Sequence, residues 1–442
     1  MHRGPVTFGT DGARGIANVG LLPEDALRLG LAAARLFGDP VLIGRDTRLS
    51  GGMLASALAA GAASGGARVI DAGILPTPGV AALAPILGAA SAGVVSASHN
   101  PYPDNGIKFF SGEGRKLTAG EERELEALTG DPSPERPTKG GIGAVERLDG
   151  AAGLYVEGVL SRLRPGAEGT RVLLDCANGA AFEAAPMALA ELGAELTVTG
   201  NEPDGTNIND GCGSTHVRSL DASGHDVAFA FDGDADRVLA KDEKGEVVDG
   251  DRIIAVLARD LAERGALAGG VVVTVMSNLG FFKAMDALKI PYEVTPVGDR
   301  HVAETMRRTG ASVGGEQSGH VILSEHVTTG DGIVTALALL DVMSRTGKPL
   351  SELARVMEVY PQELINVTVP DAASAKTLAA SEAVENAVLV AEERLGEEGR
   401  ILLRPSGTEP VVRVMVEHAD EDVCREVCEE VAGVVAEAGV RA

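Results

Sequence analysis

Short, nearly continuous apolar runs alternate with helical patterns over most of the chain. The runs that predict buried strands lie at residues 40–44, 171–175, 226–231 and 270–275. The first of them stands between helical segments at 23–37 and 51–65. A strand with one solvent-facing side alternates apolar and polar positions, whereas these runs are apolar throughout, which indicates sheets covered on both faces. The pattern therefore predicts an α/β protein.

The C-terminal segment follows a different order of elements. It reads as a strand, a long helix, two strands and a final helix, at residues 363–369, 374–395, 400–404, 411–417 and 420–438. Stretches rich in Pro, Gly or charge, or following a hairpin-like turn, predict junctions at residues 130–145, 245–250 and 358–370. We therefore expect four segments, each carrying one polar loop, at residues 1–148, 149–247, 248–362 and 363–442.

Composition limits the class of function. A chain of 442 residues is too long for a single hydrophobic core, which agrees with several domains. Aromatic residues make up only 3%, Trp is absent, and the formal net charge is −25. These values disfavour nucleic acid and anionic membranes as partners, because both require a cationic or base-stacking surface. A small anionic substrate remains compatible, since arginines can gather in a local cleft.

The segment from residue 72 to 95 lacks any charge and is long enough to span a bilayer. Pro76, Pro78 and Pro85 interrupt it, so it predicts a turn, a buried helix and a buried strand. No charged-then-apolar leader opens the chain. The spacing of the four cysteines favours reduced, buried thiols, and we expect a cytoplasmic protein.

A buried strand that ends at Val95 is predicted to place Ser98 in a turn. Asn100 and Pro101 prevent the strand from continuing through this turn. His99 lies beside the serine and Lys108 follows ten residues later. A serine hydroxyl is a weak nucleophile without a base, but a phosphoserine placed near cations can carry a phosphoryl group. The alternative is that these residues only shape the turn.

Asp232, Asp234 and Asp236 alternate just after the apolar run 226–231. In an extended loop, alternation places all three carboxylates on one side. Three close carboxylates repel one another unless a cation binds them, and Mg²⁺ is the usual oxygen-bound companion of phosphates. The alternative, a solvated acidic turn, is disfavoured because the ends of sheets are where α/β proteins bind ligands. Arg237 follows at once and is placed to contact a substrate or balance the carboxylates.

Two further loops carry polar groups suited to a sugar phosphate. Residues 314–320 supply Glu316, Gln317, Ser318 and His320, which can hydrogen-bond vicinal hydroxyls and move a proton, although a lone histidine is often structural. The other loop offers Arg404, Ser406, Gly407, Thr408 and Arg413. Guanidinium groups and converging backbone N–H groups can bind a phosphate with several hydrogen bonds. The alternative is that this loop is a plain turn after a strand. The Gly-rich stretch 8–15 and the basic turn 44–48 match no nucleotide-binding motif.

The four loops together resemble the α-D-phosphohexomutase superfamily over essentially the full length of the chain, in the family's order and approximate spacing. Within it, the chain most resembles the bacterial phosphoglucosamine mutases. This aminosugar subgroup is indicated by Gln317 and by residues 205–209, 212–216, 274–280 and 297–300. His301 stands where tyrosine is expected in the subgroup, a departure that bears on the sugar and not on the chemistry.

The resemblance implies a role for each loop. The implied catalytic positions are Ser98 as phosphoserine, with His99, Arg14, Lys108 and His320, the last two as general acid and base. The implied metal ligands are Ser98, Asp232, Asp234 and Asp236, which would hold one Mg²⁺. The implied substrate-binding positions are Arg237, Glu316, Ser318, Arg404, Ser406, Gly407, Thr408 and Arg413. The implied architecture is three similar mixed α/β domains plus a smaller C-terminal α+β domain around a central cleft.

The implied reaction interconverts glucosamine 6-phosphate and glucosamine 1-phosphate through a hexosamine 1,6-bisphosphate, and feeds the synthesis of UDP-N-acetylglucosamine and cell-wall precursors. We expect a sugar phosphate as the only class of partner, and a monomer or a homodimer. A phosphomannomutase or phosphoglucomutase of the same superfamily is the nearest alternative. A metal-dependent phosphatase with an aspartate nucleophile and a non-catalytic sugar-phosphate sensor are the others.

Overall fold

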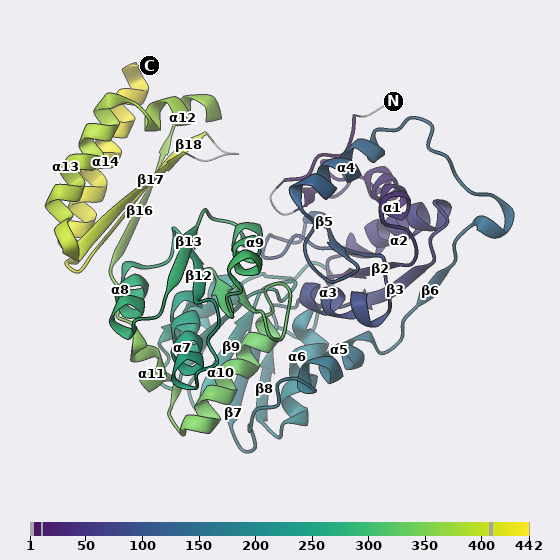
Figure 1. Cartoon of the computed structure of the whole chain (residues 1–442), viewed down its shortest axis with the longest axis horizontal. Helices are drawn as coiled ribbons and strands as arrows, with labels where there is room; N and C mark the ends of the chain where they lie inside the picture. Colours follow the sequence, from purple (N-terminus) through teal and green to yellow (C-terminus); the bar gives the residue numbers. More distant parts are fainter. Residues whose placement is uncertain (1–3, 10–11, 406–409, 442) are drawn as a thin grey trace. The chain divides into compact units, whose positions relative to one another are not determined.

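Four sheets organise the chain in the computed structural model, which describes residues 4–9, 12–405 and 410–441 (Figure 1). The chain forms two compact units, Met1–Met276 with Leu288–Val356, and Ser277–Ala287 with Met357–Ala442. The first unit contains three sheets and the second contains the fourth. The α/β class predicted from the apolar runs is confirmed.

The first sheet has six strands in the order β1-β5-β4-β2-β3-β6. Its strands are β1 Ala13–Ile16, β2 Val41–Arg45, β3 Val69–Ile74, β4 Ser91–Val95, β5 Asp104–Ser111 and β6 Val145–Arg147. Its helices are α1 Pro23–Phe37, α2 Gly51–Ser64, α3 Thr77–Ile86 and α4 Ala119–Thr129. β4 pairs antiparallel with β5 and sets Lys108 opposite Val94. The loop between these strands carries Ser98, so the serine and the lysine belong to one hairpin.

Helices α1 and α2 pack against each other at two glycines. A Cβ atom on Gly30 would stand 1.9 Å from the carbonyl oxygen of Leu58, and one on Gly61 would stand 2.0 Å from that of Leu27. Neither contact leaves room for a side chain. Leu29 and Leu58 lie in the same buried apolar cluster, which the two helices build above the sheet.

The second sheet has the order β11-β10-β9-β7-β8. Its strands are β7 Arg171–Asp175, β8 Glu195–Thr199, β9 Val227–Phe231, β10 Val238–Asp242 and β11 Val247–Val248, and its helices are α5 Ala151–Leu160 and α6 Ala181–Glu191. Every residue of β9 is buried, as its unbroken apolar run predicts. β9 and β10 pair antiparallel with Phe231 opposite Val238. The loop that joins them is therefore the stretch that contains the three aspartates.

The third sheet has the order β13-β12-β14-β15. Its strands are β12 Val271–Thr274, β13 Tyr292–Thr295, β14 Val313–Gly315 and β15 Val321–Leu323. Its helices are α7 Gly250–Glu263, α9 Asp299–Thr309, α10 Gly332–Thr346 and α11 Leu350–Leu353. β14 and β15 form a hairpin with Gly315 opposite Val321, so that residues 316–320 make its turn.

The second unit is a small α+β body. Its sheet has the order β16-β18-β17, with β16 Gln362–Thr368, β17 Gly399–Pro405 and β18 Val411–His418 all antiparallel to their neighbours. Its helices are α8 Leu279–Leu288, α12 Ala372–Ala379, α13 Glu382–Leu395 and α14 Glu421–Arg441. The single long helix predicted over 374–395 is wrong. The backbone of Ser381 is extended (ψ 144°) and begins α13 as its N-cap, with Glu382 and Glu385 in the first turn.

Short 3₁₀ turns complete the described elements, at η1 Lys139–Gly141, η2 Ser214–Ser219, η3 Ala354–Val356 and η4 Gly396–Glu398. The uncharged stretch 72–95 contains helix α3 and strand β4, as predicted, but it begins with the end of strand β3 where a turn was expected. Across the described residues, no helix combines the length and the apolar composition that crossing a membrane requires. All four cysteines are free thiols. The domain boundaries given above stay a prediction.

Candidate active site

Ser98 lies almost fully buried in the β4–β5 loop, with a left-handed φ of 52°. Its Oγ donates a hydrogen bond to Oδ2 of Asp232 (2.6 Å) and lies 3.2 Å from Nδ1 of His99. Its backbone N–H donates to Oγ of Ser96 (3.0 Å). The serine loop and the aspartate loop, 134 residues apart in sequence, are therefore in direct contact.

Asp232, Asp234 and Asp236 are buried, and one carboxylate oxygen from each lies within 4.8 Å of the others. The expectation that an extended, alternating loop brings them together is wrong. Ala235 has a φ of 58°, and its N–H donates to the carbonyl oxygen of Asp232 (3.0 Å). A tight turn, not the period of a strand, thus gathers the carboxylates.

Lys108 supplies the cation that faces this turn. Its Nζ donates to Oδ2 of Asp234 (2.6 Å) and lies 3.6 Å from Oδ2 of Asp236. Burial alone would lower the pKa of Lys108, but the charges of Asp234 and Asp236 outweigh it and hold that pKa above its usual value. Thr77 also donates to Oδ2 of Asp234 (2.6 Å). Lys108 is thus held in its charged form at the centre of the site.

Two of the carboxylates, those of Asp232 and Asp236, differ in their affinity for protons. Burial, followed by the charges of Asp236 and Asp234, raises the pKa of Asp232 well above its usual value. Burial also acts on Asp236, but the neighbouring cationic groups, Lys108 first, outweigh it and hold its pKa well below the usual value. Crowded carboxylates repel one another, and a bound cation removes this repulsion.

The chemistry of this donor set fits a magnesium ion. Oδ1 of Asp234 and Oδ1 of Asp236 are buried, and neither has a hydrogen-bond partner in the part of the chain that the structure describes. Mg²⁺ binds through carboxylate oxygens and is the usual ion at phosphate-handling sites. Asp232, Asp234 and Asp236 can therefore hold the ion, with Oγ of Ser98 beside them.

His320 and Glu316 occupy the turn between β14 and β15. The buried His320 places Nδ1 at 3.7 Å from Oδ2 of Asp236, and its Nε2 accepts a hydrogen bond from the N–H of Gly330 (3.1 Å). Burial would lower the pKa of His320, but the carboxylates of Asp236 and Asp299 raise it overall. Oε1 of Glu316 accepts from the N–H of Gly298 (3.1 Å), and Ser318 is exposed. The sugar-reading loop predicted from sequence therefore adjoins the acidic turn.

Arg14 and Arg237 add positive charge near Ser98. Arg14 lies on β1 opposite Gly106 of β5, and Arg237 places Nε at 3.7 Å from Oδ1 of Asp236. The N–H of Arg237 also donates to Oδ1 of Asp232 (3.2 Å). Burial, and then the charges of Arg237 and Arg14, lower the pKa of His99. His99 is thus kept neutral, with one ring nitrogen beside the serine hydroxyl.

The predicted phosphate loop belongs to the second unit. Arg404 on β17 and Arg413 on β18 lie directly opposite each other in the antiparallel register, and both are half-buried. Ser406, Gly407 and Thr408 lie outside the described residues. Directly opposite residues of an antiparallel pair are close neighbours on the same face of the sheet. That these two arginines bind a phosphate stays a prediction.

Sequence reasoning noticed the basic turn 44–48 but gave it no role. Arg48 is 1% exposed, and its Nε donates to Oδ2 of Asp46 (2.9 Å). Its Nη2 donates to the carbonyl oxygens of Ser98 (2.9 Å) and Asn100 (2.8 Å), and its Nη1 to that of Pro101 (2.5 Å). One feature of the sequence could have indicated this role. The turn directly follows β2, which is paired with β4, the strand that leads to the Ser98 loop.

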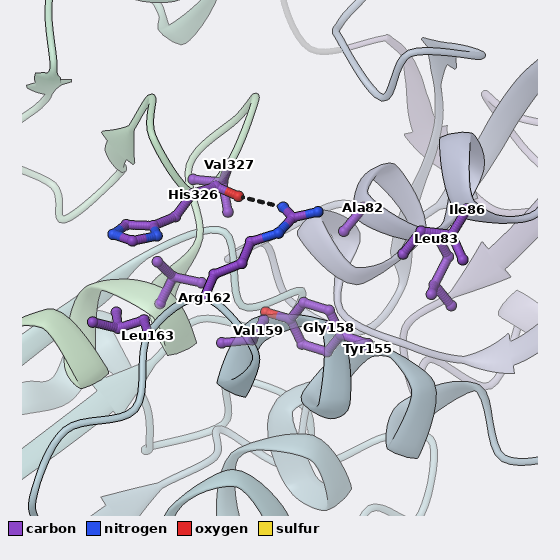
Figure 2. Close-up of a pocket in the computed structure, with 11 residues that line it drawn as sticks. Ala82, Leu83, Ile86, Tyr155, Gly158, Val159, Arg162, Leu163, His326 and Val327 are labelled. Carbon is purple, nitrogen blue, oxygen red and sulfur yellow. Dashed lines mark hydrogen bonds between the residues drawn. The ribbon is translucent and has the colours of Figure 1, made fainter.

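A separate cavity lies between α3, α5 and the loop at His326, and Figure 2 shows its lining. The lining is mostly apolar, and Arg162 donates to the carbonyl oxygen of His326 (3.0 Å) at its rim. Its volume of about 20 Å³ leaves room for about one water molecule. This cavity is too small for a sugar phosphate, and none of the predicted site residues lines it.

Comparisons with known proteins match the chain along its length. Four family profiles match it, described as phosphoglucomutase/phosphomannomutase alpha/beta/alpha domain I (residues 5–135), domain II (153–245), domain III (249–360) and C-terminal domain (364–434). A phosphoglucosamine mutase of Rubrobacter xylanophilus is 72% identical over 434 residues, which cover 98% of each chain. The chain belongs to the phosphoglucomutase/phosphomannomutase family. Each of the four matched ranges of this family member contains one of the polar loops found in its sequence.

Solved structures share the fold of this family member. A phosphoglucomutase/phosphomannomutase family protein from Burkholderia thailandensis superposes with a TM-score of 0.81 at 26% identity, covering 96% of each chain. An N-acetylphosphoglucosamine mutase from Aspergillus fumigatus, solved with GlcNAc-6P and magnesium, superposes with a TM-score of 0.71 at 20% identity, covering 98% of this chain and 96% of its own. The architecture predicted from the resemblance, three α/β domains and a distinct C-terminal one, agrees with the family profiles.

Proposed function

We propose that this chain interconverts glucosamine 6-phosphate and glucosamine 1-phosphate, with Ser98 as the residue that carries the phosphoryl group. The observation that carries the proposal is the contact between a buried serine hydroxyl and a buried three-carboxylate turn. Oγ of Ser98 lies 2.6 Å from Oδ2 of Asp232, and Nζ of Lys108 lies 2.6 Å from Oδ2 of Asp234 in the same turn. A nucleophile, a cation site and a fixed ammonium group are the parts that phosphoryl transfer requires.

The residue roles follow from this geometry and from the family. Asp232, Asp234 and Asp236 hold Mg²⁺ together with Ser98. When bound, the ion supplies positive charge to the oxygens of the transferring phosphoryl group. Lys108 and Arg14 neutralise the same oxygens from the protein side, and His99 orients the serine. These assignments are proposals to be tested residue by residue.

In the first half of the reaction, phosphoserine 98 gives its phosphoryl group to O1 of glucosamine 6-phosphate. The P–O bond to Ser98 breaks and a P–O bond to O1 forms. We assign to His320 the base that takes the proton of the O1 hydroxyl, and to the charged Lys108 the acid that protonates the released Oγ of Ser98. Both residues lie beside Asp236. The product of this half-reaction is a 1,6-bisphosphate.

In the second half, the bisphosphate turns end for end and returns its 6-phosphoryl group to Ser98. Glu316, Ser318 and Arg237 contact the sugar. The loop with Arg404, Ser406, Gly407, Thr408 and Arg413 holds the phosphate that is not reacting. That loop must accept a phosphate in either orientation of the sugar, which explains a set of several donors. Exclusion of water protects the phosphoserine from hydrolysis between the two halves.

The choice of glucosamine rests on relatedness. A relative that is 72% identical over 98% of the chain is named phosphoglucosamine mutase, and others at about half identity carry the same name. The family description itself names glucose and mannose as the sugars, so a phosphoglucomutase or phosphomannomutase is the second candidate. We further propose that the protein works in the cytoplasm, as a monomer or homodimer, with the domain boundaries predicted from the sequence.

A substrate comparison with the Ser98→Ala variant tests the proposal. Purified protein with Mg²⁺ and a trace of bisphosphate should isomerise glucosamine 6-phosphate faster than glucose 6-phosphate or mannose 6-phosphate. Ser98→Ala should lose at least about 10³-fold in kcat, because the covalent step disappears. Ser56→Ala, at an exposed serine on α2, is the matched control and should keep full activity. Near-normal turnover by Ser98→Ala would contradict the covalent mechanism, and faster turnover of mannose or glucose 6-phosphate would reassign the sugar.

A further inference from the structure

The backbone carbonyl groups of Ser98 and Asn100 share two side-chain donors. Nη2 of Arg48 donates to both, at 2.9 and 2.8 Å. Nδ2 of Asn209 also donates to both, at 2.9 and 3.1 Å. Four hydrogen bonds from two side chains thus fix the backbone on either side of His99, and Asn209 does not reach the reacting hydroxyl itself.

The two donors come from different parts of the chain. Arg48 follows β2 in the sheet that also carries the Ser98 loop. Asn209 belongs to the segment of the second sheet, which carries the three aspartates, and lies 111 residues from Ser98 in sequence. Arg48 therefore holds the serine loop to its own sheet, whereas Asn209 holds it to the sheet of the carboxylates.

Asn209 is itself firmly placed. It is 8% exposed and has a φ of 60°, and its N–H donates to the carbonyl oxygen of Ala177 (2.9 Å). Asparagine tolerates this left-handed region better than most residues. A Cβ atom on Gly233 would lie 2.8 Å from Nδ2 of Asn209 and 2.6 Å from the carbonyl oxygen of Ser98. The amide is thus packed between the serine loop and the aspartate turn.

Ser98 needs such support. A non-glycine residue with positive φ is held there only when its surroundings determine its conformation. The direction of Oγ toward Asp232 depends on that backbone conformation, because the backbone sets the direction of the Cα–Cβ bond about which χ1 rotates. A shift of about 1 Å in a reacting group can reduce a rate by about 100-fold. The hydrogen bonds to the carbonyl oxygen of Ser98 therefore influence the rate of the reaction, although they are made to the backbone and not to Oγ.

We propose that Asn209 is a positioning residue, which fixes the Ser98 loop against the Asp232 turn so that Oγ faces the carboxylates. The proposal rests on the function proposed above. It assigns to Asn209 an effect on turnover without an effect on sugar binding, because its amide contacts backbone and not the loops that read the sugar.

The test compares Asn209→Ala and Asn209→Asp with Asn207→Ala in the full-length protein. Asn207 lies in the same loop, and among the described residues its side chain bonds only to Glu202 and Asp204 of that loop, so it controls for damage to the loop. We expect kcat to fall about 10- to 100-fold in Asn209→Ala, with KM for glucosamine 6-phosphate unchanged within about twofold. Asn209→Asp should be slower still, because a carboxylate replaces a donor in front of two carbonyl oxygens.

Hydrogen–deuterium exchange supplies a readout that needs no turnover. The amides of residues 96–100 should exchange faster in Asn209→Ala than in the wild type, while Asn207→Ala should match the wild type. An unchanged kcat, a loss confined to KM, or an equal loss in Asn207→Ala would overturn the proposal. If the wild type isomerises no hexose phosphate, the proposed function fails, and unchanged exchange in Asn209→Ala would then separately refute the positioning role.

Discussion

At the scale of single residues, the site depends on how little room surrounds Gly233. A methyl group there would meet the Ser98 carbonyl oxygen at 2.6 Å and Cδ1 of Ile208 at 2.8 Å. Real Cβ atoms do not approach a backbone oxygen that closely, so either the serine loop or the aspartate turn must move. Gly233→Ala should therefore lower kcat by at least about tenfold.

Gly153→Ala is the matched control for that substitution. Gly153 lies in helix α5, and beyond its own helical turn no atom of the described residues lies within 4 Å of an added Cβ; alanine is also the better helix former. Steady-state kinetics of both variants check the expectation. Equal activity of Gly233→Ala and the wild type would show that the two loops are not locked together as the structure has them.

The sequence points to the candidate site residues, but not to the way in which the fold brings them together. Ser98, Lys108 and the aspartates stand in polar stretches directly after or within apolar strands, which marks the end of a sheet. No sequence pattern indicates the left-handed backbone conformation of Ala235, because alanine seldom adopts that conformation. Arg48 and Asn209 bind carbonyl oxygens in a distant loop, and no local pattern shows which backbone groups a folded chain brings to a side chain.

At the scale of elements, helix α4 begins with a reciprocal pair of hydrogen bonds. Oγ1 of Thr118 accepts from the N–H of Glu121 (3.3 Å), and Oε2 of Glu121 accepts from the N–H of Thr118 (2.7 Å). Arg115 adds two hydrogen bonds to the same carboxylate, at 2.8 and 2.7 Å. The hydrogen bond from Arg115 is the main cause that lowers the pKa of Glu121 to about 2.

This lowered pKa makes the stability of the helix depend on pH. The ionised carboxylate is favoured in the folded state, so its contribution is full above the ordinary pKa near 4.5 and is lost as pH falls toward 2. Glu121→Gln should therefore be less stable than the wild type at pH 7, by under about 1 kcal/mol because the pair is only partly buried and solvent screens it. The difference should shrink by pH 3.

Urea unfolding at the two pH values measures this difference. Glu124→Gln is the control, since Glu124 is exposed on the same helix and has no ion-pair partner among the residues of known placement. A deficit of Glu121→Gln that stays constant from pH 7 to pH 3 would show that the ion pair with Arg115 does not stabilise the helix.

Element positions followed closely from the apolar pattern, and the one break it missed is instructive. The predicted helix 374–395 is two helices because Ser381 and Glu382 form a start signal within a continuous helical pattern. Exposed Leu389 and Val390 on α13 extend that pattern without being buried. The periodicity of apolar residues therefore predicts whether a segment is a helix or a strand more reliably than it predicts where the segment begins and ends.

At the scale of the whole molecule, the candidate site residues are divided between the two compact units of the chain. The serine, the lysine and the aspartates belong to the first compact unit, and Arg404 and Arg413 belong to the second. The sequence predicts a distinct C-terminal body from its different order of elements. It does not predict that the first three sheets form one unit, because that depends on contacts such as Ser98–Asp232 and Thr77–Asp234 between distant segments.

Removal of the metal should consequently affect the two units differently. Without Mg²⁺, three buried carboxylates of the first unit face one another, whereas none of the three carboxylates proposed to hold the ion belongs to the second unit. Treatment with EDTA should abolish activity and lower the melting temperature of the first unit by several degrees, because a ligand bound only to the folded state stabilises it. Added Mg²⁺ should restore both.

Hydrogen exchange resolves the units within one sample. Peptides from β9 and the loop after it should lose protection on chelation, and peptides from α13 and α14 should not. Asp234→Asn should remove the response to Mg²⁺, whereas Asp221→Asn, at an exposed aspartate of the same segment, should keep it. Because the carboxylates also bind Lys108 and Thr77, some protection should persist without metal in the wild type. Equal loss of protection in both units, or full activity after chelation, would remove the ion from its proposed place at the aspartate turn.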